Sequence, residues 1–302
     1  MTNWVSLAIS STAISGVVSI IDSHLITRRM PGLRTYLLVI GAFHLVYSFV
    51  FSSLFPLPVG TGALPIMVAV ASGILRTGAI IIMFYTLKKE EVSQVIPIVH
   101  AYPVIVVIMA VPLLGETLSY LDYLAIVMVV GGAIAVSFRQ SSSGSIIWRG
   151  KPLLLLFGAS LLLAIADTTS KYAMNYILPW NMFWISGFCM CAIFIPIALR
   201  PHTLHQLSDM KQKGPTVTCL VLNEVLAPIT ILLMFMALEA GPVSLVSTVL
   251  GGGRPLFVFI FAFILSRILP RFIEWHADGG MLALRLIAIA MIAGGVVIIQ
   301  LN

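Results

Sequence analysis

Long apolar stretches alternate with short polar connections along the whole chain. Each stretch holds about 20 residues, the length that an α-helix needs to cross a hydrocarbon core of about 30 Å. The apolar runs and the Pro, Gly and Ser clusters between them predict ten membrane-spanning helices. Their approximate bounds are 4–27, 35–55, 64–87, 92–114, 119–138, 152–174, 180–199, 216–238, 243–266 and 281–301.

Composition supports an all-α integral membrane protein and excludes a soluble domain. Of the 302 residues, 60% are hydrophobic and only 9% are charged, against roughly 25% charged residues in soluble domains. Cys189, Cys191 and Cys219 all fall inside apolar runs, where a thiol behaves as a small hydrophobe. No spacing typical of metal ligands appears, so neither a metal nor a cofactor is expected.

The basic residues predict an orientation. Of the 17 Lys and Arg residues, only Arg76, Lys171 and Arg254 lie within spans, and all the others lie in or beside the odd-numbered connections. The positive-inside rule then puts both termini outside, in a plasma (inner) membrane. The same rule explains the basic charge, so no nucleic-acid partner is expected.

The second half of the chain repeats features of the first. Asp22 aligns with Asp167 at an offset of 145 residues, and Leu87 aligns with Leu238 at an offset of 151. We therefore predict two repeats, residues 1–140 and 141–302. Because each contains five spans, the repeats must have opposite orientation, as in transporters whose substrate site lies in a central cavity between the halves.

Short motifs at matching places in the two halves carry a family resemblance. They are Tyr85-Thr86-Leu87 and Met236-Ala237-Leu238, Pro103 and Pro255, Gly115-Glu116, and the pairs Gly131-Gly132 and Gly294-Gly295. With the ten predicted spans, the chain resembles the EamA-type branch of the drug/metabolite transporter superfamily. The resemblance implies export or exchange of small metabolites by alternating access. It also implies cytoplasmic termini, in disagreement with the charge distribution.

Three charged residues fall in the middle of predicted spans: Arg76, Glu224 and Arg254. A charge at the bilayer centre costs roughly 2.5–3.5 kcal/mol on insertion scales, so each is a candidate substrate-binding residue. Glu224 could instead pair with one arginine and only hold helices together. One guanidinium would still be left over, and its planar fork suits a carboxylate or a phosphate.

Further candidates lie at similar depth. His100 lies between Pro97 and Pro103, which loosen the fourth span and expose backbone groups that only a lined cavity tolerates. Tyr102 and Trp184 are candidate cavity aromatics. The alternatives are a hydrogen-bonded buried histidine and aromatic rings that only fill the core.

Asp22, Asp167 and His44 are candidates for gating or proton coupling. An inverted repeat puts the two acids toward opposite membrane faces, which suits gates, and imidazole titrates near neutral pH. Alternatively, the acids neutralise nearby bases, Arg28 for Asp22 and Lys171 one helical turn after Asp167.

The ninth span is expected to break at Gly251-Gly252-Gly253-Arg254-Pro255. A glycine costs a helix interior about 1 kcal/mol relative to alanine, and Pro255 removes an N–H donor. A half-helix starting at Pro255 would direct its positive dipole end to an anion held by Arg254. Pro103 is the matching candidate in the fourth span. Alternatively, the glycines allow close helix packing and Glu224 holds Arg254.

These features together favour a secondary-active transporter of a small metabolite that carries a carboxylate or phosphate. A membrane-embedded enzyme and a non-transporting scaffold are the alternatives, but we find no His-Glu-x-x-His, Gly-x-Ser-x-Gly or phosphate-loop motif. The expected partners are the small-molecule substrate, the lipid bilayer and a proton as the candidate coupling ion. The chain is expected to act as a monomer or homodimer.

Overall fold

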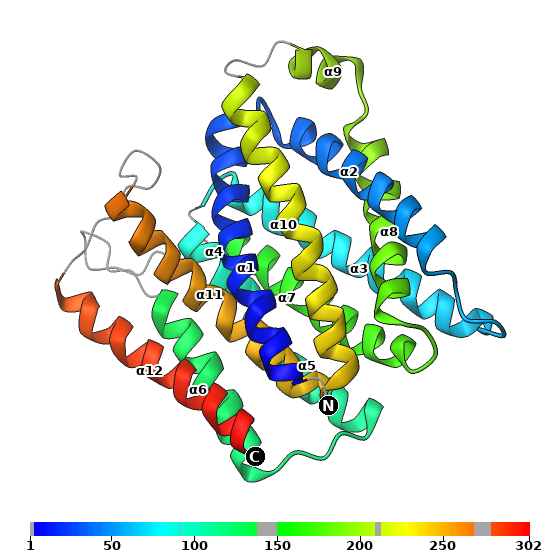
Figure 1. The fold of residues 1–302 in the computed structure, drawn as a ribbon. Coiled ribbons are helices and arrows are strands. Elements are labelled where there is room, and N and C mark those ends of the chain that lie inside the picture. The colour runs from blue at the N-terminus through cyan, green and yellow to red at the C-terminus, as the bar shows by residue number, and fades with distance from the viewer. Residues whose placement is uncertain (1–2, 91, 138–149, 209–212, 269–278) are drawn as a thin grey trace.

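The computed structural model describes residues 3–90, 92–137, 150–208, 213–268 and 279–302, and these residues form helices and connections without strands (Figure 1). The predicted repeat boundary between residues 140 and 141 lies outside them. The helices are α1 (Trp4–His24), the π-helix η1 (Leu25–Arg29), α2 (Leu33–Leu54), α3 (Ala63–Leu87), α4 (Val92–Val99), α5 (Pro103–Leu114), α6 (Tyr120–Ser137), α7 (Gly150–Met174), α8 (Pro179–Ala198), α9 (Pro201–Ser208), α10 (Lys213–Ala240), α11 (Val243–Ile268) and α12 (Gly279–Leu301).

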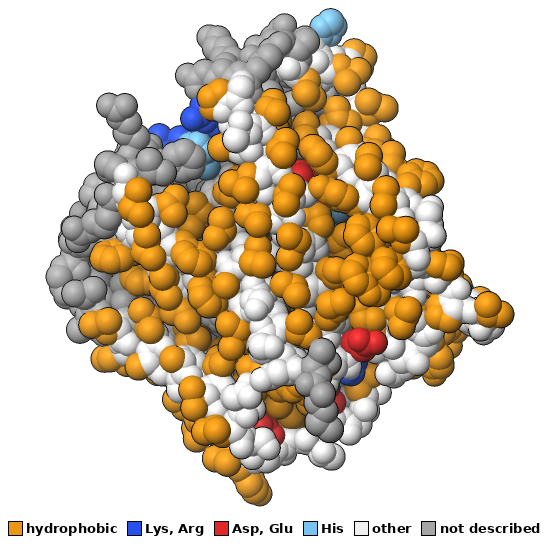
Figure 2. Space-filling model, in the orientation of Figure 1, with side chains coloured by type: hydrophobic (Ala, Val, Ile, Leu, Met, Phe, Trp, Pro, Cys, Tyr) orange, Lys and Arg blue, Asp and Glu red, His pale blue; other side chains and the backbone are white. Residues whose placement is uncertain are grey.

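Seven of the described helices are long and apolar enough to cross a membrane, and the apolar helices Pro103–Leu114, Tyr120–Ala135 and Leu286–Leu301 are shorter. Figure 2 shows hydrophobic side chains over most of the visible face. Large apolar residues such as Met67, Ile108 and Val127 are each about two-thirds exposed. A soluble protein rarely exposes so continuous an apolar surface, so the chain is a multi-pass membrane protein.

Residues with special backbone preferences set several helix ends. The side chain of Asn3 accepts a hydrogen bond from the backbone N–H of Val5 at the start of α1. Pro103 and Pro179 begin α5 and α8, where a missing N–H costs nothing. Gly115 ends α5 with a φ of 67°, in the left-handed region that favours glycine.

The predicted break in the ninth span is wrong. Helix α11 runs from Val243 to Ile268 with Pro255 inside it. The three glycines serve close packing instead, because a Cβ at Gly251 would lie 2.5 Å from the carbonyl oxygen of His100, and a Cβ at Gly252 would lie 2.0 Å from Cγ1 of Val129. Tertiary contacts on this scale outweigh the low helix propensity of glycine.

The break lies in the fourth span, where α4 ends at Val99 and α5 begins at Pro103. Proline has no N–H to donate to the carbonyl of Val99, four residues earlier. The hydroxyl of Ser160 on α7 lies 3.0 Å from the carbonyl oxygens of Ile98, Val99 and Leu156, and its one proton is shared among them. A neighbouring helix thus brings a donor to the backbone groups that the break frees, as the membrane interior requires.

Helices from the two halves of the chain pack against each other. Helix α3 packs on α7, α1 on α10 and α11, α2 on α8, and α6 on α12. Glycines allow the closest approaches, since a Cβ at Gly132 of α6 would lie 2.7 Å from the carbonyl oxygen of Ala288 on α12. Segments far apart in the sequence therefore pack side by side, and α6 and α12 form a small apolar cluster of their own.

Both chain termini lie at the same end of the bundle (Figure 1). The Asn302 side chain donates to Oγ of Ser119, 2.7 Å away, in the connection between α5 and α6. Trp4 contacts Gly241, in the connection between α10 and α11. The other end carries η1 and α9.

Candidate solute-binding site

A small cavity of about 90 Å³ lies between α1, α3, α10, α11 and the break between α4 and α5. Four of the predicted substrate-binding residues line it: Arg76, His100, Tyr102 and Arg254. Apolar side chains such as Met83 and Leu250 form much of the remaining wall. No Asp or Glu is among its described lining residues.

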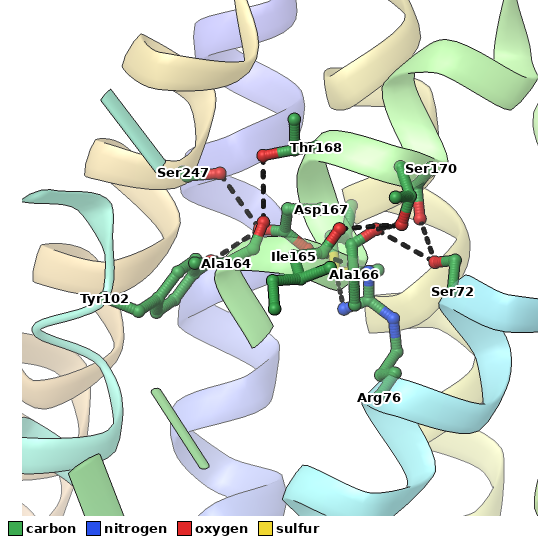
Figure 3. Close-up of polar contacts among 12 residues, drawn as sticks. Ser72, Arg76, Tyr102, Ala164, Ile165, Ala166, Asp167, Thr168, Ser170 and Ser247 are labelled. Carbon is green, nitrogen blue, oxygen red and sulfur yellow. Dashed lines mark hydrogen bonds and ion pairs between the residues drawn. The ribbon is translucent and has the colours of Figure 1, made fainter. Parts of the chain in front are cut away.

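Arg76 is held by Asp167 across the interface between α3 and α7. Its Nη2 donates to Oδ1 of Asp167 at 2.8 Å, and its guanidinium lies over the ring of Phe235. The other carboxylate oxygen accepts from Tyr102 and Ser247, each at 2.9 Å (Figure 3). Asp167 is fully buried, so these contacts replace its lost hydration.

The alternative interpretation of Asp167, a helical pair with Lys171, is wrong. Lys171 Nζ donates instead to the carbonyl oxygens of Leu238, Glu239 and Gly241, at 2.8–2.9 Å. These carbonyls belong to the C-terminal end of α10 and the residue after it, where the helix dipole favours a cation. Lys171 thus stabilises the end of a neighbouring helix.

Arg254 has only neutral partners among the described residues. Its Nε donates to Oγ of Ser15 at 2.9 Å, and its Nη1 lies 2.9 Å from Nε2 of His100. Since a guanidinium can only donate, Nε2 of His100 must accept, and the ring is neutral in this contact. The expected alternative, an ion pair between Arg254 and Glu224, is absent.

Glu224 lies away from the cavity. It is 1% exposed, and its nearest cationic candidate is His44, whose Nδ1 is 3.9 Å from Oε2 of Glu224. His44 Nδ1 also lies 3.1 Å from the carbonyl oxygen of Ile40, which can only accept, so this nitrogen carries a proton.

Asp22 lies near Glu224 rather than against Arg28. Its Oδ1 accepts from the hydroxyl of Tyr36 and from Nδ2 of Asn223, the latter at 2.8 Å. The sequence therefore identifies Asp22, His44 and Glu224 as unusual, but only the structure brings them together.

Trp184 lies outside the described cavity lining. Its Nε1 donates to the carbonyl oxygen of Phe55 at 3.0 Å, next to the side chain of Asn181, which donates to the same oxygen at 2.8 Å. These bonds join the start of α8 to the end of α2. The packing alternative describes Trp184 better than the cavity role.

The hydroxyl side chains of α1 are not among the residues predicted from the sequence. Ser11 and Thr12 line the cavity, and Ser15 binds Arg254. Ser11 and Ser15 are four residues apart and so share a helix face, a spacing that could have revealed a polar stripe in an apolar span. Asn223, which binds Asp22, stands directly before Glu224 and is likewise a polar residue inside an apolar span.

The fold and the cavity define a multi-pass membrane protein with a partly apolar cavity among its helices, into whose wall two arginines project, which is the form expected of a solute transporter. In sequence, residues 2–138 match the EamA-like transporter family, which agrees with the resemblance predicted from the motifs. The match covers the first part of the chain and points to a membrane transporter of the drug/metabolite transporter superfamily. No curated protein matches the sequence.

The fold also resembles a protein known from a crystal structure. The two superpose with a TM-score of 0.65, over 99% of this chain and 96% of the other, at 17% sequence identity. Agreement over the full length at such low identity shows a shared fold and no more.

Proposed function

We propose that this protein is a secondary-active transporter, an exporter or exchanger, of a small metabolite that carries a carboxylate or phosphate. Arg254 would anchor the anionic group. Arg76, His100 and Tyr102 would line the chamber around the rest of the solute. The protein would work by alternating access in the plasma membrane.

One observation carries the proposal: Arg254 lines the cavity with only Ser15 and His100 as partners. Its charge is not neutralised by an ion pair in the described residues, whereas Arg76 has Asp167. A desolvated guanidinium without a counter-ion favours a ligand that brings the negative charge, and its fork binds carboxylate or phosphate in a bidentate way.

The packing of the helices supports two inverted repeats. In the predicted repeats α1 corresponds to α7 and α3 corresponds to α10. If the halves are exchanged, the contact of α3 with α7 therefore becomes the contact of α10 with α1, and both contacts are present. The contact of α1 with α11 likewise becomes that of α7 with α4 and α5, which is also present. A pseudo-two-fold arrangement of this kind allows one half to rock against the other around a fixed site.

Purified protein can test the anchor. We would screen carboxylates and phosphates by thermal shift, then measure uptake and counterflow of the best ligand in proteoliposomes for wild type, Arg254→Lys and Arg254→Gln. We expect Arg254→Gln to lose roughly tenfold or more in affinity, because a charged hydrogen bond contributes about 1.5–3 kcal/mol. Arg254→Lys should retain part of it.

Arg34→Gln is the matched control, since Arg34 is exposed near the start of α2. It removes the same charge outside the chamber and should behave like wild type. If Arg254→Gln binds an anionic ligand as wild type does, Arg254 is structural. Folded protein without flux or counterflow would favour the non-transporting scaffold.

A further inference from the structure

A second polar cluster lies outside the cavity, where α1, α2 and α10 meet. It consists of Asp22, Tyr36, His44, Asn223 and Glu224, and none of these side chains lines the cavity. All are buried, with Asp22 6% exposed and Glu224 1% exposed. The cluster therefore holds two carboxyl groups deep in an apolar bundle.

Neither carboxyl group has a Lys or Arg partner among the described residues. Asp22 Oδ1 accepts from two neutral donors, Tyr36 and Asn223. Asp167, its counterpart in the second half, has an arginine at 2.8 Å as well as two hydroxyl donors. The charge of Asp167 is compensated by the protein, and that of Asp22 is not.

Three atoms in the cluster have unused hydrogen-bonding capacity. Glu224 Oε2, Asn223 Oδ1 and His44 Nε2 are all buried without a hydrogen-bond partner in the described structure. His44 Nδ1 is 3.9 Å from Oε2 of Glu224 and has the Ile40 carbonyl oxygen at 3.1 Å. Buried, unpartnered acceptors and two acids in one cluster favour binding of a cation from water, and a proton is the one that needs no added space.

We propose that Asp22 and Glu224 form a proton-binding site that is coupled to anion binding at Arg254. A proton from water adds to a lone pair of one carboxylate oxygen, forms an O–H bond, and leaves by the reverse step. The coupling part of this inference rests on the proposed function, whereas the proton site itself does not.

The coupling is electrostatic. Arg254 bonds to Ser15 on α1, and Asp22 lies about two helical turns, or ~10 Å, further along the same helix. Asn223, which donates to Asp22, stands directly before Glu224 in α10. At such separations Asp22 attracts the guanidinium without forming an ion pair, and the two acids repel each other. A proton on the pair removes negative charge that competes for the guanidinium, so an anion binds Arg254 more tightly. By linkage, the bound anion also strengthens proton binding. The result is cotransport of anion and proton in the same direction.

Other charged and titratable groups lie on the elements that hold the pair or pack against them. They are Arg28 and Arg29 on η1, Tyr36, His44 and Tyr47 on α2, Asp167 and Lys171 on α7, Cys189 and Cys191 on α8, and Arg254 on α11. Asp167 is bound to Arg76, and Lys171 binds the far end of α10. Asp22 and Glu224 are thus the acids of this group without a cationic partner.

Infrared spectroscopy of the ligand-free protein tests the proton site. The C=O band of a protonated carboxyl group should appear and disappear reversibly with pH in wild type, weaken in Asp22→Asn or Glu224→Gln, and vanish in the double variant. Glu239→Gln is the control, because Glu239 is exposed at the end of α10. A band that is absent, or that survives in the double variant, overturns the site.

Isotope labelling covers the case in which a variant does not fold. Carbon-13 in the side-chain carboxyl of aspartate or of glutamate shifts the band of that residue type in otherwise unaltered protein. A titrating band that responds to neither label overturns the site as well.

Calorimetry tests the coupling, with inorganic phosphate and succinate as the probes. Titrations in two buffers of different ionisation enthalpy give the protons taken up on binding. We expect net uptake in wild type and an affinity that falls roughly 5-fold or more from acidic to alkaline pH, the low end of typical couplings. The double variant Asp22→Asn/Glu224→Gln should lose both effects.

The outcomes separate the two proposals. Binding that needs Arg254 but takes up no proton overturns the coupling and leaves the anion site. If neither probe binds, both the anionic substrate of the proposed function and the coupling are overturned, while the infrared titration still decides the proton site.

Discussion

At the scale of single residues, the two arginines of the cavity differ in their partners. Arg76 has a carboxylate at 2.8 Å, and Arg254 has a hydroxyl and an imidazole. The sequence marks both as costly charges in a membrane. It cannot assign the partners, because Asp167 is equally well spaced for the Lys171 contact along its own helix.

The pair of Arg76 and Asp167 gives a stability prediction. Asp167→Asn leaves the guanidinium buried with its charge uncompensated, so we expect a loss of about 3–5 kcal/mol in unfolding free energy. Thermal unfolding in detergent measures the loss. Adding Arg76→Gln removes the charge that Asp167→Asn leaves without a partner, so the double variant should recover part of the stability. A double variant that loses more unfolding free energy than the two single variants together contradicts the pairing.

At the scale of helices, close packing around α11 outweighs the low helix propensity of its three glycines. Gly251 faces the broken fourth span, Gly252 faces α6, and Gly253 faces Thr12 on α1. The sequence places three weak helix formers before a proline, which resembles a break. The helix stays intact because the glycines let three neighbours approach closely, and their contacts stabilise it.

Gly252→Ala should therefore destabilise the protein. The new Cβ would lie 2.0 Å from Cγ1 of Val129, and overpacking of a core costs about 1–3 kcal/mol. Gly158→Ala on α7 is the control, because nothing lies within 4 Å of its Cβ position. Equal unfolding temperatures for the two variants would show that α11 does not pack as described.

The connection between α10 and α11 is held from two sides. The carboxylate of Glu116 accepts hydrogen bonds from the backbone N–H groups of Val243 and Ser244, at the positive end of α11. Lys171 binds the carbonyls at the negative end of α10. A side chain from each half of the sequence thus stabilises one helix end.

Removing either side chain should loosen this connection. For Glu116→Gln we expect faster hydrogen exchange at residues 241–244, by roughly tenfold, since a helix N-cap contributes about 0.5–2 kcal/mol. Lys171→Met should act similarly on the end of α10. Glu90→Gln, in the connection after α3, should leave exchange there unchanged. Unaltered exchange in Glu116→Gln would contradict the capping role.

At the scale of the whole molecule, the bundle puts both termini at one end and η1 and α9 at the other (Figure 1). Arg28, Arg29 and Arg200 lie at the second end, next to η1 and α9. The positive-inside rule predicts that this end faces the cytoplasm. A reporter fused to Asn302 should then report the outside, and a cytoplasmic signal would favour the orientation implied by the family.

The class of protein could be predicted from the sequence alone. Apolar length, composition and the spacing of turn residues are local properties, so an all-helical membrane protein and most helix bounds could be predicted from them. The same patterns identified Arg76, His100, Tyr102 and Arg254 as residues of interest, because a polar group in an apolar span is unusual wherever it lies.

Which of these residues meet depends on how the helices pack in three dimensions. Asp167 binds Arg76 on another helix, Glu224 lies with Asp22 and Asn223, and Trp184 bonds to Phe55 away from the cavity. The same packing decides which proline breaks a span: Ser160 brings a donor to the carbonyls before Pro103, while close packing keeps α11 whole around Pro255. The physical reason is the same in each case. A buried charge or a freed carbonyl must find a partner, and that partner comes from a helix distant in the sequence.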